Sequence, residues 1–282
     1  MNLYGGNPLW RDDVPNMCAN YPAPTAVSTL LRLCVAACLV ALLGCRGATR
    51  SAAPAPSPSP DHAQAAEVIL DRYVEAVGGR DAAERIQTYV LKGTFEMTGR
   101  PERLPVEVYF KRPDRSLMVI DLPGLGKLRR GQSGGAGWSQ SPFGDVVEGT
   151  PGELREVERD HDIYGSTNLR ALYREVRLES RGRLGGRDVF VVEGRPEKGP
   201  AEKMLFDAET GLLSRWDVVR RRPGQPTVHA RISLDDYRDV GGVKVPFTLR
   251  YFFEPRELVL HLSEANYNVP LDDAMFERPA QK

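Results

Sequence analysis

The fold is decided by residues 229–262, which read HARISLDDYRDVGGVKVPFTLRYFFEPRELVLHL. In the first part Ala230, Ile232 and Leu234 alternate with polar residues, a glycine pair at 241–242 follows, and alternate leucines return from 258 to 262. Successive side chains of a strand point to opposite faces, so each segment has one apolar and one solvated face. This pattern is typical of neighbouring antiparallel strands joined by tight turns.

The same alternation extends outward along the chain. Further strands are expected at residues 91–96, 106–111, 117–122, 176–178, 189–192, 204–206 and 212–219, and helices at 65–77, 81–86 and 153–173. The glycine-rich stretch 123–151 gives no clear assignment. With about ten or eleven strands and few crossover helices, a parallel sheet is excluded. The predicted fold is mainly β (α+β): a single curved, incompletely closed antiparallel β-barrel with helices packed on its concave face.

Composition divides the chain into three parts. Residues 45–64 are rich in Pro, Ala and Ser and lack the large apolar residues that a folded core needs. Alternating prolines favour an extended, semi-stiff tether. Residues 65–282 are charge-rich and periodic, and are numerous enough to form one domain with a core.

The first 44 residues have the features of an export signal. The apolar run 33–43 follows Arg32 and is about 11 residues long, whereas a membrane-spanning helix needs about 20. It ends in Leu42-Leu43-Gly44-Cys45, which resembles the bacterial lipobox. Residues 1–44 are therefore expected to be a lipoprotein signal peptide. An ordinary signal peptide with a chance cysteine is the alternative, and translation starting at Met17 or Val27 would give a more usual signal length.

Cys45 is the expected lipidation site and membrane anchor. One acyl chain, such as palmitate, binds a membrane only marginally, whereas two or more anchor it stably. The expected location is the periplasm-facing side of the bacterial cell envelope. Arg46, in place of the Asp that favours inner-membrane retention in enterobacteria, points to the outer membrane.

Charge and cysteine content exclude several classes of function. Lys+Arg and Asp+Glu are equal at 38 each, which gives no electrostatic basis for binding nucleic acid. All four cysteines lie at or before residue 45. The domain from 65 onward therefore has no disulfide, no thiolate metal site and no cysteine nucleophile.

No motif indicates an enzyme, a metal site or a cofactor. His62, His161, His229 and His261 lack metal-ligand spacing, and the acid/base cluster at 158–162 is more simply a polar helix end. Glycines from 124 to 137 match neither the Gly-x-Gly-x-x-Gly pattern nor the Walker A loop of nucleotide-binding proteins. The adjacent aspartates at 235–236 and 272–273 make poor acid/base pairs, because neighbours on a strand point apart.

Several segments together resemble a known family. They are residues 73–79 (YVEAVGG), 91–95 (LKGTF), 185–193 (GGRDVFVVE), 206–213 (FDAETGLL) and 236–247 (DYRDVGGVKVPF). Together they are similar to the LolA/LolB-like superfamily of outer-membrane lipoprotein-sorting proteins. The resemblance implies a curved, open antiparallel sheet that holds acyl chains in its concavity, and an anchored protein fits the acceptor type rather than the soluble carrier type.

If the concavity binds hydrocarbon, its lining is predicted by strand alternation. The expected inward residues are Leu91, Phe95, Val106, Val108, Phe110, Ile232, Leu234, Phe247, Leu249, Leu258 and Leu260. The alternative is that they form an ordinary filled core, in which case the protein is a non-catalytic structural or interaction module of an envelope complex. An acceptor also delivers cargo through an exposed apolar loop tip, for which residues 122–125 are the nearest match.

Overall fold

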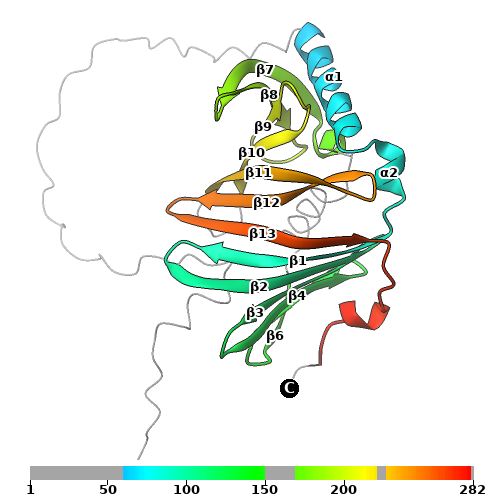
Figure 1. The fold of residues 1–282 in the computed structure, drawn as a ribbon, viewed down its shortest axis with the longest axis vertical. Coiled ribbons are helices and arrows are strands. Elements are labelled where there is room, and N and C mark those ends of the chain that lie inside the picture. Colours follow the sequence, from blue (N-terminus) through cyan, green and yellow to red (C-terminus); the bar gives the residue numbers. More distant parts are fainter. Residues whose placement is uncertain (1–59, 150–168, 221–226, 281–282) are drawn as a thin grey trace, which may run out of the picture. The chain divides into compact units, whose positions relative to one another are not determined.

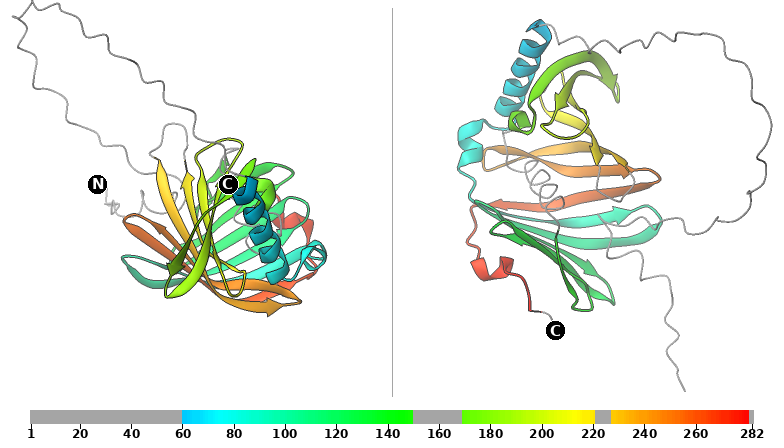
Figure 2. Two further views of the ribbon diagram at one scale, coloured as in Figure 1. Left: turned by 90° about the horizontal axis from the view of Figure 1, so that it is seen from above. Right: turned by 180° about the vertical axis from the view of Figure 1, so that it is seen from behind.

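The described part of the chain is built on one antiparallel sheet. The computed structural model describes residues 60–149, 169–220 and 227–280. Thirteen strands follow the order β6-β5-β4-β3-β2-β1-β13-β12-β11-β10-β9-β8-β7, with β6 and β7 as the two edges (Figure 1). The sheet curls into an open trough (Figure 2). The predicted fold class is confirmed, whereas the predicted number of strands is too low.

The first six strands run outward from the centre of the sheet as successive hairpins. They are β1 (Thr88–Met97), β2 (Arg100–Lys111), β3 (Arg115–Leu122), β4 (Gly126–Ser133), β5 (Ala136–Gln140) and β6 (Val146–Glu148). The last three occupy the glycine-rich stretch that sequence reasoning left unassigned. Strand β4 contains Lys127, Leu128, Arg129 and Arg130 in succession, so it shows no apolar alternation.

The other seven strands form the second half of the sheet. They are β7 (Glu175–Leu184), β8 (Arg187–Arg195), β9 (Glu202–Asp207), β10 (Leu213–Arg220), β11 (Val228–Val240), β12 (Val243–Phe253) and β13 (Arg256–Tyr267). Strand β13 pairs with β1 through matches such as Phe95 with Leu260. This pairing joins the two series of hairpins into one sheet.

Within the described ranges, four helical elements accompany the sheet. They are α1 (Pro60–Ala76), α2 (Arg80–Glu84), and the 3-10 turns η2 (Leu169–Leu172) and η3 (Asp273–Phe276). Helix α1 begins five residues before the predicted start, so the end of the predicted tether is helical. Pro60 fits the first helical turn, where its missing N–H is not needed, and Asp61 is favoured at the positive helix N-terminus.

The predicted helix at 153–173 is only partly testable. Residues 150–168 lie outside the described ranges. Within the described part, Leu169–Leu172 forms a single 3-10 turn and Tyr173 is not helical, so the predicted helical end is wrong there.

Helix α1 packs beside β7 and contributes its apolar face to the inner side of the sheet (Figures 1 and 2). Leu70, Tyr73 and Val77 are buried, and the Tyr73 ring lies 5.5 Å from that of Phe206 on β9. At its end, the backbone N–H of Lys244 donates to the carbonyl of Val77 at 2.9 Å. The expectation that the N-terminal helix packs on the concave side is confirmed.

Helix α1 can end against the β11–β12 turn because Gly78 and Gly242 approach each other closely. Gly78 has φ +121°, and a Cβ there would lie 2.1 Å from the carbonyl oxygen of Gly242. The helix therefore ends in close backbone contact with the β11–β12 turn, which only glycine allows.

Candidate functional site

The inner face of the sheet carries continuous rows of apolar side chains. Residues directly paired across an antiparallel ladder share a face. One row runs through Leu234, Leu249, Leu260, Phe95 and Leu104 on five adjacent strands. Such a row forms an apolar wall across the middle of the trough.

The residues predicted to point inward lie on this same face. Tyr251 pairs with both Ile232 and Leu258, and Leu91 pairs with Val108. Val106 and Phe110 share the parity of Val108 on β2, and Phe247 shares that of Leu249 on β12. The register thus places all eleven residues on one face, as strand alternation predicts.

These side chains are well shielded from solvent. Leu91 and Leu249 are fully buried, while Phe110 and Leu258 keep partial exposure. The ring of Phe247 is covered by the guanidinium of Arg238, whose carbon lies 4.3 Å from the ring centroid. The face is therefore apolar in its middle and meets charged groups near Phe247.

A buried carboxylate lies on the same face at the β8–β10 end. Glu202 is 2% exposed and accepts hydrogen bonds from the Tyr173 hydroxyl at 2.8 Å and from the Trp216 indole at 3.1 Å. Sequence reasoning missed this group. Strand alternation could have indicated it. Glu202, Met204 and Phe206 are alternate residues of β9 and point to the same, inner face, so Glu202 is the polar member of an inward row.

A half-buried tyrosine, Tyr237, lies near Tyr73 of helix α1. The Tyr237 hydroxyl donates to the carbonyl of Leu213 at 2.8 Å. Burial raises the pKa of Tyr237 well above its usual value, with Tyr73 and Asp235 adding to the shift. Tyr237 therefore acts as a neutral hydrogen-bond donor that ties β11 to β10.

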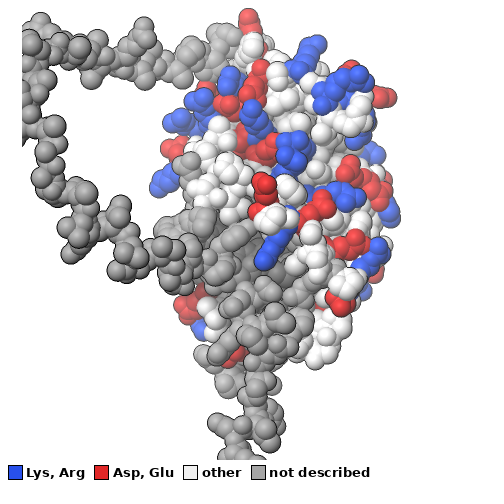
Figure 3. Space-filling view, turned by 90° about the vertical axis from the view of Figure 1, so that its left-hand side faces the viewer, with Lys and Arg blue, Asp and Glu red and all other residues white. Residues whose placement is uncertain are grey.

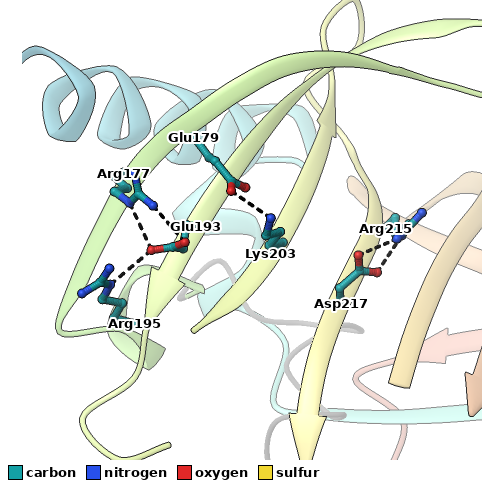
Figure 4. Close-up of polar contacts among 7 residues, drawn as sticks. All are labelled: Arg177, Glu179, Glu193, Arg195, Lys203, Arg215 and Asp217. Carbon is teal, nitrogen blue, oxygen red and sulfur yellow. Dashed lines mark hydrogen bonds and ion pairs between the residues drawn. The ribbon is translucent and has the colours of Figure 1, made fainter. Parts of the chain in front are cut away.

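The outer face of β7–β10 is a ladder of ion pairs (Figure 4). Arg177 makes two hydrogen bonds of 3.0 Å to Glu193, and Arg195 adds a third at 3.1 Å. Because these guanidiniums favour the charged form, Arg177 foremost, the pKa of Glu193 is lowered. Lys203 bonds Glu179 at 2.8 Å on the same face.

Charge of both signs is spread over the surface. On the described part of the face in Figure 3, basic and acidic side chains are intermixed. This distribution agrees with the equal counts of acidic and basic residues.

The outer face of β3–β6 instead carries an apolar cluster that is covered. Leu117, Val119, Trp138 and Val146 form a second core with Phe276, which is fully buried. The cover is residues 271–280, here called the C-terminal strap, which includes η3. The Trp138 indole donates to the carbonyl of Phe276 at 3.1 Å. Sequence reasoning did not predict this second core.

Polar groups fix the strap in place. Asp272 accepts from the backbone N–H of Ala274 at 3.0 Å and so caps η3. Asp273 contacts Lys111 at 2.5 Å and Arg115 at 3.2 Å, and its pKa is lowered mainly by the hydrogen bond from Lys111. The aspartate pair at 272–273 thus has a structural use.

Three of the other acidic and histidine residues considered in the sequence also have local partners. Asp236 pairs with Arg238 at 2.6 Å. The His62 ring bonds the carbonyl of Leu178 at 2.9 Å, and His261 lies 3.7 Å from Glu96. His161 lies outside the described ranges. Among the residues that the structure describes, no group of three or more His, Cys, Asp or Glu could hold a metal ion.

Two predictions concern membrane contact. Cys45, the signal peptide and the tether up to residue 59 lie outside the described ranges. In the expected loop tip at 122–125, Pro123 and Gly124 are exposed, but Leu122 is buried and Leu125 is half-buried. Phe143, in the β5–β6 turn, is 74% exposed instead. Across the described residues, no helix combines the length and apolar character needed to cross a bilayer.

Comparison with known proteins identifies the fold. No protein-family model and no curated protein matches the sequence. The chain is similar in structure to a DUF1329 family protein from Desulfovibrio piger, with a TM-score of 0.56, 18% identity, and coverage of 77% of this chain and 99% of that one.

Two further structures share the fold. A putative outer membrane lipoprotein-sorting protein domain from Vibrio parahaemolyticus gives a TM-score of 0.52 at 13% identity, covering 75% of this chain and 97% of that one. A LolA superfamily protein from Nitrosomonas europaea gives 0.52 at 11% identity, covering 76% and 97%. The chain therefore has a LolA/LolB-like fold. At these identities the similarity establishes the fold and not the activity.

Proposed function

We propose that the protein is a lipid-anchored protein of the bacterial cell envelope that holds acyl chains of lipids or lipoproteins against the inner face of its sheet. The observation that carries this proposal is the apolar row Leu234–Leu249–Leu260–Phe95–Leu104, which crosses five strands without a charged residue. The lipobox-like sequence ending at Cys45 supports the anchor and the envelope location, with the outer membrane favoured by Arg46.

The energetics of such a site are favourable. Each methylene group removed from water contributes about 0.8 kcal/mol, so a long acyl chain contributes on the order of 10 kcal/mol before ordering costs. The polar groups of the lipid need not enter the apolar rows, because charged side chains such as Arg238 lie beside Phe247. An acyl chain in the trough with its head group at the rim follows from this arrangement.

A specific observation favours a second candidate function. Leu91, Leu249 and Ile232 are at most 1% exposed among the protein's own residues. A solid interior of this kind fits a structural or interaction module of an envelope complex, with no acyl chain inside. The two candidates differ in whether the inner face can admit another hydrocarbon chain.

Lipid analysis of protein loaded in the cell tests the proposal. A site-specific protease sequence inserted in the tether releases the domain from washed membranes without detergent, and organic extraction then removes noncovalently bound lipid. We expect extracted acyl chains in near-stoichiometric amount. Folded protein that yields none favours the filled-core module.

A matched pair of variants on one strand locates the bound chain. Leu249→Trp adds volume on the inner face of β12, whereas Arg250→Trp adds it on the exposed outer face. If the trough admits hydrocarbon, Leu249→Trp keeps near-normal stability and loses the lipid, and Arg250→Trp retains it. If the core is filled, Leu249→Trp destabilises by about 1–3 kcal/mol through overpacking.

A further inference from the structure

A groove of about 490 Å³ lies on the outer face of the sheet, opposite the proposed acyl site. It is bounded by β2–β5 on one side and by the C-terminal strap on the other, with Met275 and Pro279 among the strap residues that line it. Volumes of 300–1,000 Å³ with mainly apolar walls and a few polar groups are usual for small-molecule sites. The groove is therefore of a suitable size for a small ligand, and charged residues such as Arg129 and Glu277 share its lining with the apolar ones.

The floor of the groove is apolar and rigidly held. Leu117, Val119 and Trp138 are each less than 10% exposed. A Cβ at Gly131 would lie 2.3 Å from the Trp138 ring, so the indole lies directly against the β4 backbone. Its N–H already donates to the carbonyl of Phe276 at 3.1 Å. The floor thus offers apolar and aromatic surface to a ligand.

The two sides of the groove carry opposite charge. Val119 on β3 pairs with Glu107 on β2 and with Arg129 on β4, so these two charged residues flank it on the same face. Adjacent strands lie about 4.8 Å apart, which separates their backbones by about 10 Å. Lys127 lies two residues before Arg129 on the same face of β4. The β4 side therefore carries two positive charges.

The negative groups near the groove already have partners. Glu107 accepts from the Tyr109 hydroxyl at 2.8 Å, and Glu277 accepts from Ser133 at 3.3 Å. Burial and Glu107 raise the pKa of Tyr109 to about 12, so this hydroxyl stays protonated at neutral pH.

The positively charged residues of the groove differ in whether they have a partner. Arg278 is engaged with Glu148 at 2.7 Å, but the side chains of Lys127 and Arg129 form neither a hydrogen bond nor an ion pair with any residue in the described ranges. Lys127 lies across the strand ladder from Asp121, but no ion pair within the described ranges engages Lys127 or Arg129, and these two positive charges beside an apolar floor give the groove a preference for anions.

We propose that this groove binds a small monocarboxylate with an apolar body, its carboxylate against Lys127 and Arg129 and its body on Leu117, Val119 and Trp138. Glu107 disfavours the reversed orientation through like-charge repulsion. An α-zwitterion fits poorly, because its two charges are too close together to reach both sides of the groove.

Tryptophan NMR tests this site separately from the inner face. The full-length chain carrying Cys45→Ser, which cannot be acylated, is labelled with 15N-tryptophan and titrated with 4-phenylbutyrate. The charge-reversed control is 4-phenylbutylamine. Trp138 reports on the groove, whereas Trp216 reports on the inner face, where its indole bonds Glu202. Trp138→Phe assigns the Trp138 signal.

We expect 4-phenylbutyrate to shift the Trp138 signal in a saturable manner and to bind at least fivefold more tightly than the amine. The double variant Lys127→Gln/Arg129→Gln is expected to weaken binding about tenfold, equivalent to about 1.4 kcal/mol. Arg250→Gln, which removes an exposed cation from the outer face of β12, is expected to leave it unchanged.

Three results would overturn the inference: equal binding of the amine, an unchanged dissociation constant in the double variant, or a shift of Trp216 alone. The last result would place the probe on the inner face, and so would support the proposed acyl site while removing this one. Conversely, if the inner face proves to bind no acyl chain, the shift of the Trp138 signal by 4-phenylbutyrate is still expected.

Discussion

The outer face of the sheet differs between its two halves, β7–β10 and β3–β6. Over β7–β10 the outer face is charged and open to solvent, with Arg177, Glu193 and Lys203 in ion pairs (Figure 4). Over β3–β6 it carries an apolar cluster that the C-terminal strap covers, beside Lys127 and Arg129 of β4. Strand alternation alone therefore does not decide which face of an antiparallel sheet is buried, because a strap of ten residues can create a second core.

The largest expected effect on stability concerns β3–β6, the half of the sheet that the C-terminal strap covers. Phe276→Ala removes the fully buried ring at the centre of the second core and should lower the free energy of unfolding by about 3–5 kcal/mol. Urea unfolding measures it. Phe143→Ala, at an exposed turn, is the control and should change stability by no more than about 0.5 kcal/mol. A Phe276→Ala effect below 1 kcal/mol would show that the strap contributes little.

Two strand glycines compare the halves directly. At Gly131 on β4 a Cβ would meet the Trp138 ring at 2.3 Å, whereas at Gly182 on β7 the nearest atom within 4 Å is a Val189 methyl at 4.0 Å. Gly131→Ala should destabilise by about 1–3 kcal/mol through overpacking. Gly182→Ala should be neutral or stabilise by about 0.5 kcal/mol, because alanine loses less backbone entropy. Thermal unfolding of both variants should give opposite signs, and equal effects would contradict the difference in packing.

In the half of the sheet formed by β7–β10, Glu193 should determine how the free energy of unfolding changes at acid pH. Its pKa is lowered in the folded protein from 4.5, so its stabilising contribution is fully present above pH 4.5 and is lost as the pH falls further, through the folded-state pKa. Glu193→Gln should reduce stability by about 1 kcal/mol at pH 7, with a smaller penalty at pH 3. Unfolding measured across pH 3–7 tests this, and a penalty that grows toward acid would have the wrong sign.

The smallest effect is expected at the exposed pair of the open half. Lys203 bonds Glu179, and both side chains keep substantial solvent exposure. Lys203→Met should therefore change stability by less than about 0.5 kcal/mol, and the difference should disappear in high salt, which screens exposed charges. A salt-independent loss above 1 kcal/mol would mean that this ladder is a structural element comparable to the strap.

The difference between the halves also explains what the sequence could predict. Strand β11 has one buried and one solvated face, so Ile232 and Leu234 alternate with polar residues and their inward position could be predicted. Strand β3 is buried on both faces, and Leu117-Met118-Val119-Ile120 is a continuous apolar run that shows a strand but not its two cores.

The remaining errors have local causes. Gly131 provides space for Trp138, and no periodic signal marks that contact, so β4 and β5 were not predicted. Glu202 was missed because a single buried carboxylate is visible only once Tyr173 and Trp216 are brought to it by the fold. The inward face was predictable from alternation, whereas the partners of each polar group depend on long-range contacts.

The proposed acyl-binding role is tested most directly by comparing native and denatured masses of the domain released from membranes without detergent. Covalent lipid stays with the anchor peptide, so any excess in the native mass is noncovalent ligand. The proposal predicts an excess equal to one acyl lipid that is present in Arg250→Trp and absent in Leu249→Trp. Identical native and denatured masses in a folded, unmodified domain would contradict it.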